Sequence, residues 1–147
     1  MNKGYLNLVL HAHLPYIRHP EHEYFLEENW LYEAITESYI PMLEVFDRLV
    51  NDGVDFRITL SLSPVLVEMF NDSLLRDRCL RYLNNLIELS EREITRTRGD
   101  ISFEPLAKMY NRRFRRIKSL YEGSFKKDLV SAFRDLQETG KVELITS

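Results

Sequence analysis

The chain has 147 residues, of which 44% are hydrophobic and 29% are charged, a composition typical of one soluble globular domain. Its formal net charge of -3 argues against a dedicated nucleic-acid-binding protein, which normally has a large surplus of basic residues. The sequence shows neither an apolar stretch long enough for a membrane span nor a secretory signal, so we expect a cytoplasmic protein without membrane or nucleic-acid partners.

The first predicted element is a strand over residues 5–12, where apolar residues follow one another almost without interruption. Such a run is typical of a strand that is buried on both faces, as in parallel sheets. Apolar residues then recur at helical spacing from Trp30 to Val50, and the turn-forming residues 51–53 end the predicted helix. Pro41 should kink or divide this helix, because proline lacks a backbone N–H and clashes with the preceding turn.

Alternating apolar and polar residues predict a second strand from Phe56 to Leu62, and Ser63 and Pro64 supply the N-cap and first-turn proline of a following helix. Three more amphipathic helices are predicted, each stopped by a nearby glycine. They run from Leu74 to Ile94, from Leu106 to Tyr121 and from Phe125 to Leu136. A third strand is predicted over Lys141 to Thr146.

Strands separated by long helical segments indicate an α/β fold with parallel strands, because a parallel crossover needs a helix-sized connection. Three strands do not close a barrel, so a barrel would need further strands. The unpaired edge of the last strand should promote self-association or aggregation unless more protein covers it.

Two features of the predicted helices favour structural interpretations. Cys79 is the only cysteine and falls on an apolar helix face, which excludes a disulfide framework and predicts a buried thiol. The basic run at residues 112–116 lies on a helical pattern, where such charges are more often a solvated face than a phosphate site.

All four histidines lie at the end of the first predicted strand or in the segment after it. Residues two apart in a strand share a face, so His11 and His13 should point in the same direction. In parallel α/β folds the carboxyl ends of the strands form the ligand site. This position favours a functional role, although hydrogen-bonded core histidines are an equally ordinary outcome.

Two functional interpretations of the histidine pair stay open. Neutral imidazoles on one strand face can share a Zn²⁺ ion, as in metal-dependent hydrolases. Alternatively, they can bind sugar hydroxyls and stabilise an oxocarbenium-like transition state without a metal. Trp30 is interpreted either as a stacking platform for a sugar or as a core anchor, and the nearby glutamates as solvated side chains. Those glutamates are Glu21, Glu23, Glu27 and Glu28.

Several segments in sequence order carry a family resemblance. They are residues 4–6, 10–16, 27–35, 37–41, 59–64 and 140–147. Together they resemble the opening of the α-glucan branching enzymes and related α-amylases of glycoside hydrolase family 57. His11 to Tyr16 resembles the first family signature, and the stretch from Val142 to Ser147 resembles the start of the second.

The resemblance implies that residues 1–147 form the N-terminal portion of an incomplete seven-stranded β/α barrel that ends within the second signature. It also implies that His11 lines the donor-glucan site, that His13 is a neighbouring contributor, and that no cofactor or metal is needed. The substrate would be an α-1,4-glucan such as glycogen, starch or a maltooligosaccharide. Trp30 completes the expected substrate-binding set.

In that family the glutamate nucleophile and the aspartate acid/base lie on later strands. No residue here, Glu143 included, is therefore expected to be catalytic, and this chain alone should be inactive. The leading hypothesis is a segment of a retaining 1,4-α-glucan branching enzyme. The alternatives are a metal-dependent hydrolase that uses the histidine pair and a non-catalytic oligosaccharide-binding segment.

Overall fold

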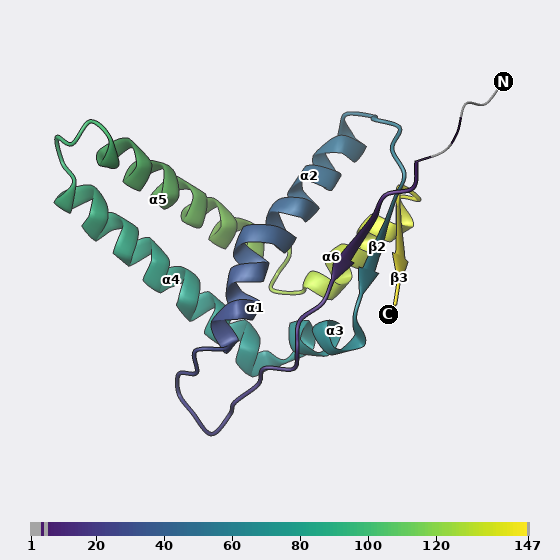
Figure 1. Ribbon diagram of the computed structural model, residues 1–147, viewed down its shortest axis with the longest axis horizontal. Coiled ribbons are helices and arrows are strands. Elements are labelled where there is room, and N and C mark those ends of the chain that lie inside the picture. The colour runs from purple at the N-terminus through teal and green to yellow at the C-terminus, as the bar shows by residue number, and fades with distance from the viewer. Residues whose placement is uncertain (1–3, 5, 147) are drawn as a thin grey trace.

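The computed structural model describes residues 4 and 6–146. Within these residues the strands are β1 (Val9–Ala12), β2 (Ile58–Leu62) and β3 (Val142–Ile145), which form one parallel sheet with β2 in the middle (Figure 1). Helices provide both crossovers between the strands. The predicted α/β class with parallel strands is confirmed.

The helices of the described residues follow the predicted order. They are α1 (Glu28–Ala34), α2 (Ile40–Asn51), α3 (Pro64–Asn71), α4 (Ser73–Arg96), α5 (Phe103–Ser119) and α6 (Leu129–Glu138). Across these segments, no helix is long and apolar enough to cross a membrane.

The predicted division of the first helical region at Pro41 is confirmed. A π-helical segment, Ile35–Tyr39, separates α1 from α2, and Pro41 lies in the first turn of α2. Proline is tolerated in a first turn, because its missing N–H would have no partner within that helix. The Ser63 cap is also confirmed, since its hydroxyl oxygen accepts the Leu66 backbone N–H at 3.3 Å.

The last helix begins later than predicted. Lys126 and Lys127 adopt the left-handed conformation, with φ values of 50° and 61°, and α6 starts only at Leu129. Left-handed residues cannot continue a right-handed helix. Asp128 caps the new start, because its carboxylate accepts the Ser131 backbone N–H at 3.0 Å. The prediction of a helix from Phe125 is therefore wrong for its first turn.

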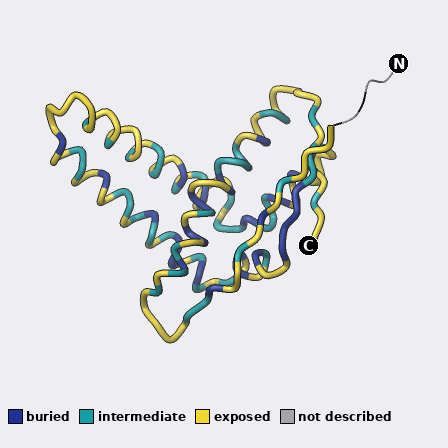
Figure 2. The backbone as a smooth tube through the Cα atoms, in the orientation of Figure 1, coloured by how far each residue is buried: buried dark blue, intermediate teal, exposed yellow. Residues whose placement is uncertain are grey.

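One face of the sheet packs against the helices. Ala12, Leu60, Leu62 and Val142 are buried in the same core as the apolar faces of the surrounding helices. The opposite face is uncovered at both edge strands, where His11, Glu143 and Ile145 are exposed. Figure 2 shows the resulting contrast between the buried middle strand and the exposed residues at the edges.

The prediction that the first strand is buried on both faces is wrong. The strand begins at Val9, and the exposed fractions of Leu6, Leu8 and Val9 are 95%, 54% and 49%. Residue 5, the predicted strand start, lies outside the described residues. A run of apolar residues cannot distinguish an edge strand with one covered face from a central strand, since only the packing of other elements decides this.

Helices α4 and α5 pack against each other and project from the sheet-bearing part of the molecule (Figure 1). The basic run at residues 112–116 lies on α5, and three of its arginines form ion pairs at exposed positions. The pairs join Arg113 to Glu37, Arg115 to Glu91 and Arg116 to Glu44. The interpretation of this run as a surface feature agrees with these contacts.

Cys79 is a free, fully buried thiol on α4, as predicted. Burial raises the pKa of its thiol to about 12, because the thiolate would lose its hydration in the core. Its position on the apolar face of α4 gives it the role of a small core side chain.

Candidate functional site

His11 and His13 lie side by side at the carboxyl end of β1. Their ring centroids are 5.8 Å apart and their planes differ by 14°. Both residues are exposed. The prediction that they share a direction is confirmed, and the interpretation as core histidines is wrong for both. Two accessible imidazoles can donate or accept hydrogen bonds to a ligand on this side of the sheet.

The neighbouring strands add polar groups to the histidine-bearing face. The strand register places His11 beside Ser61 and Thr59 beside Glu143. The Thr59 hydroxyl donates a hydrogen bond to the Glu143 carboxylate at 2.9 Å. The Ser61 hydroxyl is buried and has no hydrogen-bond partner among the described residues. We call these five residues, His11, His13, Thr59, Ser61 and Glu143, the polar sheet face.

Thr59 and Ser61 were not among the residues predicted for this face. A signal was present, because the alternation from Phe56 to Leu62 puts Thr59 and Ser61 on the polar side of their strand. What the sequence could not provide was the register that brings Ser61 beside His11. The polar sheet face combines hydroxyls, imidazoles and one carboxylate, the kinds of group that bind sugar hydroxyls.

Trp30 lies in α1 with 50% of its surface exposed, so the interpretation as a core anchor is wrong. Its indole is free to stack on a ligand. The structure brings the two histidines together, but among the described residues it shows no ring contact between Trp30 and either of them. The tryptophan therefore forms a separate candidate contact.

The interpretation of the four glutamates as solvated side chains is wrong for Glu28, which is only 1% exposed. Its carboxylate accepts a hydrogen bond from the Arg78 guanidinium at 2.6 Å and another from the Tyr32 hydroxyl at 2.8 Å. Glu21 and Glu23 are exposed, as expected. Burial and the Glu28 carboxylate both raise the pKa of Tyr32 far above its ordinary value, so Tyr32 stays a hydrogen-bond donor.

His11 and His13 are two possible ligands for the zinc ion of a metal-dependent hydrolase. A catalytic zinc site generally has three protein ligands. Across residues 4 and 6–146, no group of three or more histidine, cysteine, aspartate or glutamate side chains is placed to hold a metal ion.

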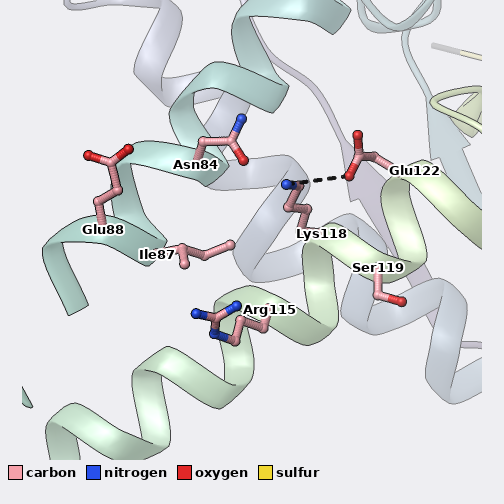
Figure 3. Close-up of a pocket in the computed structure, with 7 residues that line it drawn as sticks. All are labelled: Asn84, Ile87, Glu88, Arg115, Lys118, Ser119 and Glu122. Atoms are coloured by element: carbon pink, nitrogen blue, oxygen red, sulfur yellow. Dashed lines mark ion pairs between the residues drawn. The ribbon is translucent and has the colours of Figure 1, made fainter. Parts of the chain in front are cut away.

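Figure 3 shows a hollow between α4 and α5. Its lining is Asn84, Ile87, Glu88, Arg115, Lys118, Ser119 and Glu122. Each charged side chain in it has an ion-pair partner, including the Lys118–Glu122 pair at 3.7 Å. Among these pairs, only the Arg115–Glu91 pair joins α5 to α4, whereas the other two pairs lie within one helical segment each. None of the predicted site residues contributes to this hollow.

Comparison with known proteins gives a family match. The model of the family described as glycosyl hydrolase family 57 matches residues 7–147. The 1,4-α-glucan branching enzyme TK1436 of Thermococcus kodakarensis is 35% identical to this chain over 145 residues. The match covers 99% of this chain and 21% of that enzyme, so the chain spans about a fifth of the length of this relative.

Solved structures give the same result. The α-amylase AmyC of Thermotoga maritima is 42% identical, with a TM-score of 0.89, over 95% of this chain and 26% of that one. A GH57-type branching enzyme of Pyrococcus horikoshii is 33% identical, with a TM-score of 0.90, over 99% of this chain and 27% of that one. Both the sequence and the fold are thus shared with about a quarter of each longer protein.

Proposed function

Since the chain belongs to glycosyl hydrolase family 57, we propose that it supplies part of the glucan-binding site of an enzyme that processes α-1,4-glucans. The observation that supports this proposal most directly is the pair of exposed, adjacent imidazoles at the carboxyl end of β1. In α/β folds this end of the sheet is where ligands bind. The chain spans about a fifth to a quarter of the length of these relatives, so the activity proposed below is that of a whole enzyme of this kind.

The proposed architecture is the start of a seven-stranded β/α barrel. Its outer layer is the helix-covered side of the sheet, and its interior is the polar sheet face. The parallel order of β1, β2 and β3 and their helical crossovers support this proposal, because barrels of this type place all crossover helices outside. Four further strands would then complete the barrel.

The proposed activity of the whole enzyme is glycosyl transfer with retention, as in 1,4-α-glucan branching. The support is the 35% identity to a branching enzyme over nearly the whole chain. A second candidate is hydrolysis of α-1,4 linkages. It is favoured by the 42% identity to an α-amylase, which is higher than the 35% identity to the branching enzyme. The α-amylase match covers 95% of this chain and the branching-enzyme match 99%.

Within this site, each side chain has a proposed task. His11 hydrogen-bonds the hydroxyls of the donor glucan, and His13 supports it from a ring that lies 5.8 Å away and nearly parallel. Trp30 stacks on a sugar ring through its exposed indole face. The site contains no cofactor in this proposal, because hydrogen bonding and stacking suffice to hold a neutral sugar.

The proposal predicts that the His11→Ala variant binds maltoheptaose at least about fivefold more weakly than the unchanged chain, the loss expected for one hydrogen bond. Calorimetric titration at millimolar ligand measures this affinity. The matched control is Arg92→Ala, which removes an exposed side chain from α4, away from the sheet and from the loop after β1. Equal losses in the two variants, or no heat with the unchanged chain, would count against the assignment.

We also propose that this chain by itself does not turn over glucans. A retaining glycosidase needs two carboxyl groups about 5–5.5 Å apart. Among the described residues of the polar sheet face, only Glu143 carries a carboxylate, and it is engaged with the Thr59 hydroxyl. Incubation with amylose should leave chain length and branch content unchanged, whereas new α-1,6 linkages or reducing ends would contradict the proposal.

A further inference from the structure

The segment between β1 and α1, residues 13–27, has no regular structure, yet it joins the two parts of the proposed site. It begins at His13 and leads directly into the helix that holds Trp30. We call it the β1–α1 loop. Its central part has few backbone hydrogen bonds of its own, such as the one from the His22 N–H to the His19 carbonyl at 3.2 Å. Its shape therefore depends on side chains from elsewhere.

Arg78 of α4 supplies the most buried of these contacts. Its guanidinium donates to the His19 carbonyl at 3.2 Å and to the His22 carbonyl at 2.5 Å. It also pairs with the Glu28 carboxylate at 2.6 Å, and Glu28 in turn accepts the His19 backbone N–H at 3.0 Å. The two charged side chains together engage both the N–H and the C=O of His19. They clamp the loop onto α4 and onto the first residue of α1.

Other contacts of the loop are more exposed. Arg81 donates to the Glu23 carbonyl at 2.8 Å, and Arg18 pairs with Asp72 at 2.5 Å, but the Arg18 and Asp72 side chains are 32% and 21% exposed. The Arg78 and Glu28 side chains are only 9% and 2% exposed. Charge-assisted hydrogen bonds are stronger away from water, whereas exposed pairs contribute little. The buried pair thus dominates the placement of the loop.

We propose that Arg78 is a positioning residue for the glucan site, acting through the β1–α1 loop to fix Trp30 relative to the His11 and His13 rings. Arg78 itself touches no sugar. Its planar fork is needed because it serves three acceptors at once, which the single ammonium of lysine cannot do with the same geometry. The inference rests on the proposed function, since it assigns the loop a role in the same site.

The test compares Arg78→Lys and Glu28→Gln with the exposed control Arg92→Lys on the same helix. Two readouts are taken from each protein. The first is amide hydrogen exchange at His19 and His22, with Thr59, whose N–H donates to the Leu8 carbonyl, as the reference in the sheet. The second is the affinity for maltoheptaose.

The expected effects on exchange and affinity differ in size among the three variants. Arg78→Lys accelerates amide exchange at His19 and His22 at least about tenfold and leaves exchange at Thr59 unchanged. The same variant weakens maltoheptaose binding at least about fivefold. Arg92→Lys changes neither the exchange nor the affinity. Glu28→Gln gives an intermediate effect, because the amide still offers one acceptor oxygen. This second variant also keeps the test sound if Arg78→Lys folds poorly.

Three outcomes would overturn the inference while leaving the proposed function intact. Unchanged exchange at His19 and His22 would show that Arg78 does not hold the loop. Equal acceleration at Thr59 would show that it acts on the whole fold instead. Faster loop exchange with unchanged affinity would show that loop placement is irrelevant to binding. Failure of the unchanged chain to bind maltoheptaose overturns the proposed function and the positioning role with it, while the exchange readout still reports separately on the clamp.

Discussion

Replacing Arg78 by methionine is expected to lower the free energy of unfolding by about 3–5 kcal/mol, the cost of leaving a buried charge without its partner. The carboxylate of Glu28 is almost fully buried, and Arg78 is the cation that pairs with it. Methionine also leaves the carbonyls of His19 and His22 without this donor. Urea denaturation followed by circular dichroism measures the change.

Two companion variants separate this mechanism from a general loss of packing. Arg92→Met removes an arginine of the same helix whose ion pair with Glu88 is exposed, and it should cost less than about 1 kcal/mol. Adding Glu28→Gln to Arg78→Met should restore part of the lost stability, because no unpaired charge is then buried. A double variant less stable than the single one would contradict the explanation.

The second large effect is expected in the aromatic core. Phe133 of α6 is 1% exposed, and its ring lies 6.2 Å from that of Phe70 and 6.4 Å from that of Tyr39. It joins α6 to α3 and to the π-helical segment before α2. Phe133→Ala should lower the free energy of unfolding by about 3–5 kcal/mol, because it removes buried apolar surface and leaves a cavity.

The matched control for this variant is Phe103→Ala at the start of α5. Phe103 is 57% exposed, so its truncation removes little buried surface and should have an effect within about 0.5 kcal/mol. Phe133→Leu should cost less than Phe133→Ala, since most of the volume is retained. A loss for Phe133→Ala as small as the one expected for Phe103→Ala would show that α6 does not depend on this aromatic contact.

Much of the fold could be predicted because its signals are local. The Ser63 cap and Pro64 mark the start of α3, and Pro41 marks the change from the π-helical segment to α2. These residues act within a turn of the backbone, so their effect is readable from neighbours in the sequence. The parallel orientation of the strands also followed from the length of the crossovers.

The errors arose where the sequence pattern carries no signal for the conformation. Lys126 and Lys127 are ordinary residues for a helix start, and the pattern does not indicate their left-handed backbone. The apolar run before His11 was expected to be covered on two faces, but β1 is an edge strand. Neither outcome is encoded by periodicity, which reports only the local alternation of side chains.

In the candidate site too, the features set by neighbouring residues were predicted, whereas those set by residues far apart in the sequence were missed. The shared face of His11 and His13 follows from the period of a strand and was predicted. The burial of Glu28 was missed because its partner Arg78 is 50 residues away, and a buried carboxylate is recognisable only together with its cation. The placement of Ser61 beside His11 required the register of β1 and β2.

Nuclear magnetic resonance titration with maltoheptaose tests the central assignment most directly, because it reports each side chain separately. We predict saturable shifts of the imidazole signals of His11 and His13 and of the Trp30 indole N–H, with unchanged signals from the projecting helices α4 and α5. Absence of any shift at millimolar maltoheptaose, or shifts confined to the hollow between α4 and α5, would contradict the assignment of the glucan site to this end of the sheet.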